Sequence, residues 1–146
     1  MIITFCGHSD FQGSEELKQR MLQFLTHHVG DRQAVLYFGG YGAFDRFAHR
    51  CAQAYKVTHP NMKLILITPY LKVHKSDCGY DETIYPPLEH IPRRLAIIYR
   101  NQWMVRQADM IVAFVDHTWG GAYQVLCYAR KQRKLIFDLA QGNMVQ

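Results

Sequence analysis

Apolar residues occur along the chain in two alternating patterns, short unbroken runs and longer stretches with helical spacing. The unbroken runs, typical of buried strands, cover residues 2–6, 35–38, 63–68, 110–115 and 135–139. Between them, apolar side chains recur every three or four residues, as in helices that bury one face. Because the runs lack polar alternation, both faces of the sheet are expected to be covered. The pattern therefore predicts an α/β three-layer sandwich of about five parallel strands with helices on both faces.

Residues that commonly begin or end helices lie at the ends of the stretches with helical spacing. Ser14 is a candidate N-cap, and Gly30 is placed to end the helix that follows it. Pro92 can occupy the first position of a later helix, which runs to about Gln107. Residues 70–90 show no clear period, so we expect a long loop there. Loops of this length in compact domains are often functional.

Length and charge narrow the class of protein. A chain of 146 residues, 49% of them hydrophobic, is the usual size of one globular domain, and we expect residues 1–146 to form one. The net charge of +5 helps to retain an anion, but no concentrated basic stripe indicates a nucleic-acid partner. The chain has neither a basic N-terminal leader nor an apolar run of the roughly 18–20 residues that span a membrane. We therefore expect a cytoplasmic protein.

The cysteines show no pattern of a metal site or a disulfide framework. Cys6, Cys51 and Cys127 lie within apolar patterns and are expected to be small buried residues, and Cys78 lies in the long loop. No CxxC pair or other zinc-ligand spacing is present. The sequence thus predicts neither a metal nor a cofactor.

Three glycine-containing turns follow predicted strands. They are Gly7-His8-Ser9, Gly39-Gly40-Tyr41-Gly42 and Gly120-Gly121. If the strand order is 3-2-1-4-5, all three turns converge on one crevice at the switch point of the sheet, where such folds bind ligands. Glycine allows a ligand to approach the backbone, and amides at a helix N-terminus favour anions. Alternatively, each turn needs glycine for its shape alone.

Four segments resemble one known family. Phe5-Cys6-Gly7-His8-Ser9 is similar to the Cys-Gly-Ser-Ser turn of the Lonely Guy (LOG) family, within the broader SLOG superfamily. Residues 37–42 resemble its Tyr-Gly-Gly-Gly turn, and residues 100–104 with Ala108-Asp109 resemble its Arg-Lys-x-x-Met segment. Gly120-Gly121 falls where the family has Pro-Gly-Gly-x-Gly-Thr-x-x-Glu. The resemblance implies a Rossmann-like fold, a nucleotide-related ligand and a homodimer that forms through helical faces.

The same resemblance leaves the activity open. LOG enzymes hydrolyse the N-glycosidic bond of a nucleoside monophosphate, and the resemblance implies that reaction for this chain. Arg100 stands at the position of the family's arginine. The catalytic Glu falls at Cys127, the Thr at Gln124 and the Pro at Trp119. A cysteine cannot stabilise the positive charge that develops on the sugar, which requires a carboxylate. Binding without catalysis is therefore the first interpretation.

Other residues are candidates for the missing role or for ligand contact. Asp116 and Asp45 are carboxylates near the crevice, although each can instead cap a turn or helix, and Asp81 and Glu89 in the loop are expected to be solvated. His8 can bind a phosphate or carry a proton, or bond to backbone; His117 is a weaker candidate. Trp119 is the best candidate to stack on a base. Arg100 either contacts a phosphate or pairs with an acid to lock its helix.

These observations give a defined set of site residues. The ligand-binding candidates are Gly7, His8, Ser9, Gly39, Gly40, Tyr41, Gly42, Arg100, Trp119, Gly120, Gly121 and Ala122. If the chain is an enzyme, the catalytic candidates are Arg100, Asp116 and Asp45. The expected function is binding of a nucleotide or a nucleotide-derived signal. The alternatives are a nucleotide N-glycosidic hydrolase and a non-catalytic interaction domain.

Overall fold

The computed structural model describes residues 1–71 and 79–145. Its strands are β1 (Ile2–Gly7), β2 (Ala34–Phe38), β3 (Met62–Ile67), β4 (Glu82–Ile84), β5 (Met110–Phe114), β6 (Leu135–Asp138) and β7 (Asn143–Val145). Its α-helices are α1 (Glu15–His28), α2 (Ala43–Lys56), α3 (Ala96–Gln107) and α4 (Gly121–Lys131). The described strands form one sheet in the order β4-β3-β2-β1-β5-β6-β7. This is the Rossmann-like α/β fold that the sequence predicts.

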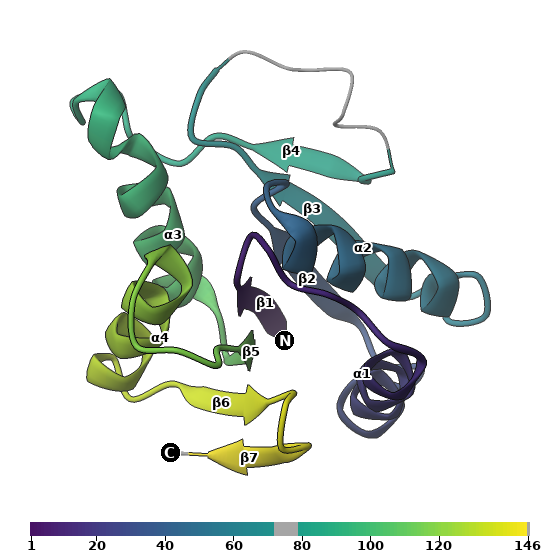
Figure 1. Cartoon of the computed structure of the whole chain (residues 1–146). Coiled ribbons are helices and arrows are strands. Elements are labelled where there is room, and N and C mark those ends of the chain that lie inside the picture. The colour runs from purple at the N-terminus through teal and green to yellow at the C-terminus, as the bar shows by residue number, and fades with distance from the viewer. Residues whose placement is uncertain (72–78, 146) are drawn as a thin grey trace.

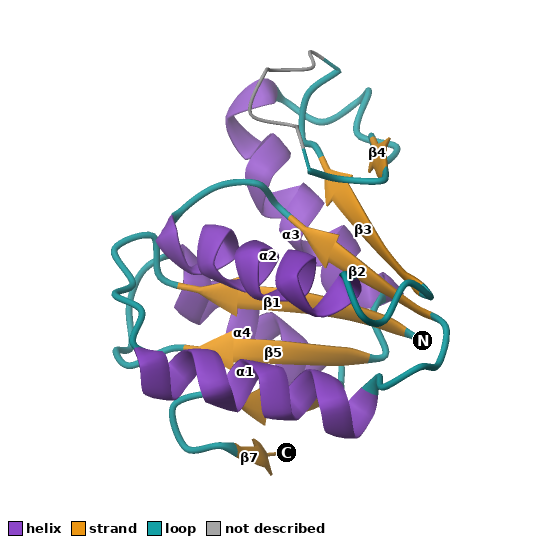
Figure 2. Cartoon of the chain, turned by 90° about the vertical axis from the view of Figure 1, so that its right-hand side faces the viewer, coloured by secondary structure: helices purple, strands orange, loops and turns teal. Residues whose placement is uncertain are grey.

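Helices cover both faces of the sheet. Helices α1 and α2 pack on one face, and α3 and α4 pack on the other (Figures 1 and 2). Successive residues of β1 supply the two cores in turn: Phe5 belongs to the α1–α2 core and Cys6 to the α3–α4 core. Residues of β5 alternate in the same way, with Val112 in the first core and Ala113 in the second. Burial on both faces explains why these strands read as unbroken apolar runs.

The centre of the sheet positions the predicted crevice. Strand β1 pairs in parallel with β2 on one side and with β5 on the other. The chain thus leaves β1 toward one edge and later returns to its other side, which creates the switch point between β1 and β5. The five predicted strands lie in the predicted order. Their carboxyl ends bring the three glycine turns to one edge of the sheet.

Two short strands lie where the sequence pattern predicts none. Strand β4 falls within the expected loop of residues 70–90 and pairs in parallel with β3, as Ile67 with Ile84. Strand β7 follows the last predicted strand and pairs antiparallel with β6. Each has three residues, two of them exposed, so neither carries an apolar run. Residues 72–78 of the expected loop, Cys78 among them, lie outside the described residues.

The predicted helix boundaries are confirmed in most details. The Ser14 hydroxyl accepts a hydrogen bond from the Leu17 amide at 3.1 Å. Gly30 has a φ of +56° and follows Val29, which is the C-cap residue of α1. Pro92 precedes a single 3₁₀ turn, Arg93–Leu95, which leads into α3. None of the helices in the described part of the chain is long and apolar enough to cross a membrane.

Candidate functional site

A cavity of about 510 Å³ lies at the carboxyl ends of the central strands. Its walls combine the ends of β1 and β2 with one face of α3 and the start of α4. Most of the predicted site residues line it: Gly7, His8, Ser9, Gly39, Tyr41, Asp45, Arg100, Trp119, Gly120, Gly121 and Ala122. The structure thus brings together residues of all three glycine turns.

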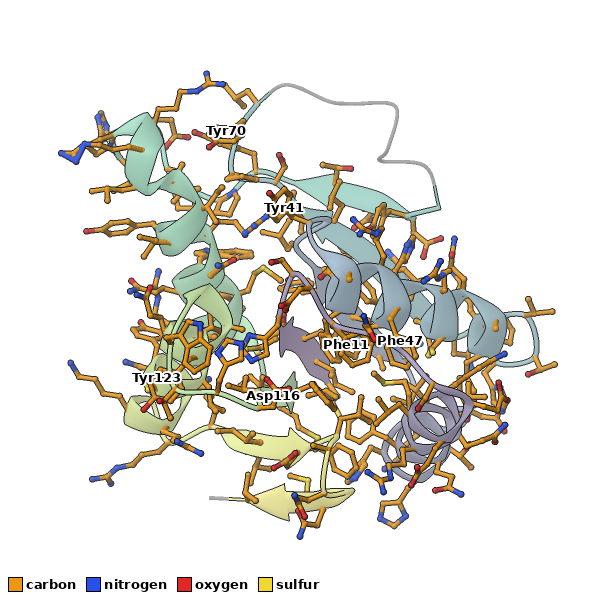
Figure 3. The ribbon with its side chains drawn as sticks, in the orientation of Figure 1. Phe11, Tyr41, Phe47, Tyr70, Asp116 and Tyr123 are labelled. Atoms are coloured by element: carbon orange, nitrogen blue, oxygen red, sulfur yellow. The ribbon has the colours of Figure 1, made fainter. Side chains whose placement is uncertain are left out.

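Three of the predicted residues lie outside this lining. Gly40 and Gly42 have positive φ angles of +73° and +91°, so both serve the shape of the turn. A Cβ atom on Gly40 would come within 2.6 Å of the Leu66 side chain. Asp116 lies beside the cavity, with its side chain 63% exposed. In the view of Figure 3, Asp116 and Tyr41 lie on opposite sides of β1.

Asp45 occupies the amides of the second glycine turn. Its two carboxylate oxygens accept hydrogen bonds from the Gly39 amide at 3.1 Å and from the Gly40 amide at 2.8 Å. Burial raises the pKa of Asp45 to about 6, although these two hydrogen bonds and the charge of Arg100 oppose the rise. The side chain reaches back to the turn instead of capping its own helix. The amides of Gly39 and Gly40 are therefore taken by the protein itself.

Arg100 is a buried cation in the wall of the cavity. Its side chain projects from the middle of α3, and the residue is only 4% exposed. One terminal nitrogen, Nη1, donates to the carbonyl oxygens of Gly39 at 2.9 Å and Ile67 at 2.7 Å. Nε donates to the Asn101 side chain at 2.8 Å. Within the described ranges these bonds use Nε and Nη1, which leaves Nη2 for another acceptor. Burial lowers the pKa of Arg100, but the group stays charged at neutral pH.

The start of α4 is an open helix N-terminus. Gly120 occupies the N-cap position with a φ of +88° and provides no side-chain cap. The first N–H groups of a helix have no partner within the helix. A Cβ atom added to Gly121 would meet nothing within 4 Å, so there is free space beside these amides. This turn, unlike the one after β2, keeps its amides available.

A ladder of three aromatic rings lies along the rim of the cavity. The ring centroids of His8 and His117 are 3.6 Å apart, and those of His117 and Trp119 are 3.8 Å apart. His8 is buried, whereas Trp119 is 67% exposed at the outer end of the ladder. The outer position of Trp119 allows it to stack on a further ring.

His8 and Asp116 are joined by two contacts. The Asp116 backbone amide donates to Nε2 of His8 at 3.2 Å, and the Asp116 carboxylate lies 3.2 Å from the same nitrogen. Nε2 of His117 is 3.7 Å from that carboxylate. The three side chains offer ligand atoms within 4.8 Å of one another, a spacing that can hold a metal ion. The sequence singled out these residues separately but did not predict that they meet.

Several lining residues were missed by the sequence reasoning. Asp10 follows Ser9 at the first turn, and Asn101 follows Arg100 on α3. Phe44, Met104 and Val125 supply apolar wall. The helical spacing of Val125 identified only a buried face. Asp10 is adjacent to a predicted site residue, and Asn101 lies within the segment 100–104 that resembles the LOG family.

The position matched to the family's catalytic Glu lies further along α4. The helix contributes Gly121, Ala122 and Val125 to the cavity, whereas Cys127 is half-buried and is not among the lining residues. Cys6 and Cys51 are buried as predicted, and burial raises the pKa values of their thiols to about 12 and about 11. Such thiols are inert at neutral pH.

Comparison with known proteins gives similarity of structure only. No family model matches the chain, and no curated protein matches its sequence. DNA processing protein A from Helicobacter pylori, described with a single-stranded DNA binding mode, aligns with a TM-score of 0.66 at 16% identity. The alignment covers 94% of this chain but only 64% of that one.

Two further solved structures are proteins of the molybdenum cofactor. The molybdenum cofactor binding protein of Rippkaea orientalis aligns with a TM-score of 0.61 at 17% identity, over 92% of this chain and 73% of that one. The Moco carrier protein of Chlamydomonas rheinhardtii aligns with a TM-score of 0.51 at 15% identity, over 92% and 72%. The chain therefore shares a Rossmann-like fold with these proteins.

Proposed function

We propose that the cavity binds a nucleotide or nucleotide-derived small molecule. The observation that carries this proposal is that the exposed ring of Trp119 lies next to the open N-terminus of α4 in the chain. The helix begins two residues after Trp119. A phosphate fits the free amides beside Gly121, and a base fits the outer face of Trp119. The charge of Arg100, buried in the same wall, favours an anion.

The size and lining of the cavity support a small molecule. A volume of about 510 Å³ falls within the roughly 300–1,000 Å³ of ordinary ligand sites. Apolar side chains such as Phe44, Met104 and Val125 supply wall, and a few polar groups converge on the interior. Similar solved structures are described as binding single-stranded DNA or the molybdenum cofactor, so both belong among the ligands to be tested.

A thermal-shift panel tests this proposal. We expect phosphate-bearing nucleotides to raise the melting temperature, with about 2.7 kcal/mol of stabilisation at a hundredfold excess over the Kd. The panel includes AMP, cyclic nucleotides, ADP-ribose, the molybdenum cofactor and an oligothymidine. A response to the oligomer alone would replace the small-molecule assignment with nucleic-acid binding. No response from any compound would favour an interaction domain.

Substitutions at Gly121 locate the phosphate. Gly121→Asp places a negative charge in free space beside the α4 amides, and an acid in the first turn of a helix does not harm the fold. Gly121→Asn has the same shape without the charge and is the matched control. We expect Asp to weaken nucleotide binding roughly tenfold or more, as measured by calorimetry, and Asn to weaken it much less. Equal affinities for the two variants would contradict a phosphate at this helix.

A hydrolase is the second candidate, and Asp45 is the residue that favours it. Its carboxyl lines the cavity and has a pKa of about 6, which suits an acid or base near neutral pH. Asp116 is the weaker choice, because its exposed carboxylate lies beside the cavity against His8. Release of free base from AMP, lost in Asp45→Asn but kept in Asp116→Asn, would support this activity. Intact AMP after long incubation would exclude it for this substrate.

A further inference from the structure

We propose that His8, Asp116 and His117 form a binding site for a first-row divalent metal ion, with Zn²⁺ as the expected ion. The three residues come from the ends of two neighbouring strands, β1 and β5, at the mouth of the cavity. Two imidazoles and one carboxylate are ligands that zinc commonly takes in proteins. The site requires no bound nucleotide.

The distances between the ligand atoms are close to those of a metal centre. Donor atoms about 2.0–2.1 Å from a tetrahedral zinc ion lie roughly 3.3 Å from one another. Asp116 Oδ1 lies 3.2 Å from Nε2 of His8 and 3.7 Å from Nε2 of His117. These two distances are thus compatible with a coordination site once the two imidazole rings reorient.

The hydrogen bond that His8 accepts is also compatible with a metal ligand. Its Nε2 accepts a hydrogen bond from the Asp116 amide, so this nitrogen carries a lone pair in that arrangement. Nδ1 of His117 is buried without a hydrogen-bond partner among the described residues. Among the described residues, no hydrogen bond to Nδ1 therefore fixes the orientation of the His117 ring, so the ring can rotate to place a nitrogen lone pair toward an ion.

Binding of the metal ion changes how the rings of His8, His117 and Trp119 stack. The rings of His8 and His117 now stack with an interplanar angle of 18°, and their lone pairs converge on one ion only when the rings tilt apart. His117 lies in the segment between β5 and α4, and its other face stacks on Trp119. A movement of His117 therefore alters the surroundings of Trp119, which makes this tryptophan a reporter of metal binding.

Three protein ligands leave a coordination position open, as in catalytic zinc sites. His8 and His117 both line the cavity, so an ion held by them would lie at its edge. Water would complete its coordination in the free protein. If the cavity binds a nucleotide, as proposed above, a phosphate oxygen replaces that water. This last role rests on the proposed function, whereas the metal site itself does not.

Titration of the protein with Zn²⁺ alone, without nucleotide, tests the site. We expect one ion per chain by calorimetry and, with Co²⁺ as a spectroscopic substitute, visible absorption bands of nitrogen and oxygen ligation. His117→Ala and Asp116→Ala lie in an exposed segment and should each weaken binding roughly tenfold or more. His27→Ala and His90→Ala, at exposed positions away from the cluster, should bind as the parent does.

Tryptophan fluorescence gives an independent readout. Zn²⁺ should change the emission of the parent protein, and Trp119→Phe should lose this change while keeping its affinity for the ion. Equal Zn²⁺ affinities of His117→Ala and His27→Ala would overturn the proposal. A sulfur-to-Co²⁺ charge-transfer band would also overturn it, because it would assign the ion to a cysteine. Nucleotide binding without metal binding would overturn this site and leave the proposed function standing.

Discussion

Arg100 donates to the carbonyl oxygen of Gly39 at 2.9 Å, so a side chain from the middle of α3 holds the turn that follows β2. The same nitrogen bonds the Ile67 carbonyl at the end of β3. Arg100→Ala leaves these acceptors without their donor, and we expect it to lower the free energy of unfolding by about 2–4 kcal/mol. Urea denaturation measures the loss. Arg100→Lys retains the charge and should lose less; equal losses would show that packing alone matters.

The proton of Asp45 links stability to pH. Its pKa of about 6 in the folded protein exceeds the ordinary value of 3.8, so the folded state binds this proton more tightly than the unfolded state does. The resulting stabilisation is complete below about pH 4 and is lost as the pH rises through 6, by about 3 kcal/mol in total. Asp45→Asn cannot titrate. The unfolding free energy of the parent minus that of the variant should therefore fall as the pH rises from about 4 through 6. Parallel pH profiles of the two proteins would contradict the raised pKa of Asp45.

Two glycines of the cavity should respond oppositely to a methyl group. A Cβ atom on Gly7 would lie 2.2 Å from the Phe44 ring, whereas one on Gly121 would meet nothing within 4 Å. Gly7→Ala should destabilise the protein by about 1–3 kcal/mol through overpacking. Gly121→Ala should be neutral or stabilise α4 by up to about 1 kcal/mol. Thermal unfolding of the two variants side by side tests the difference, and similar melting temperatures would count against the packing around Phe44.

Trp119 should contribute to ligand affinity through its exposed ring. Stacking on a base is worth about 1–3 kcal/mol, so Trp119→Ala should raise the Kd of a bound nucleotide roughly 5- to 150-fold. Trp119→Phe keeps a ring at the same place and should lose less. Calorimetry with the best nucleotide of the panel gives the comparison. An alanine variant that binds normally would place the base elsewhere in the cavity.

We propose that the chain forms a homodimer through α3. Ile97, Ile98 and Tyr99 are exposed on this helix, and a groove of about 140 Å³ separates it from α4. Ile98→Lys puts a charge at the groove and should yield a monomer by light scattering. Val57→Lys, at an exposed site after α2, is the control and should leave the mass unchanged. A parent protein that already scatters as a monomer would refute the dimer.

The fold was predictable because its strands are buried on both faces. An unbroken apolar run such as Met110–Phe114 can be recognised as a strand from its own residues, without knowing which strands pair with it. Strands β4 and β7 were not predictable, since they are defined by pairing with β3 and β6 and not by their own exposed side chains. Glu82 and Asn143 each begin a strand that has no apolar run.

The location of the cavity was predictable, but its contacts were not. The glycine turns and Arg100 indicated the edge of the sheet where the cavity lies, because the carboxyl ends of parallel strands meet there. The bond of Asp45 to the amides of Gly39 and Gly40 depends on a side-chain direction that the sequence does not encode locally. The contact of His8 with Asp116 joins residues 108 positions apart, so it needed the strand order and the register together.

The parallel pairing of β1 with β5 also sets the time at which the cavity comes into being. During synthesis, β1 can pair with β2 early, but its other edge pairs with a strand that is made only after β2, β3 and β4. The first turn of the cavity is thus made well before its opposing wall. A ligand that needs both walls therefore binds only after β5 has paired with β1.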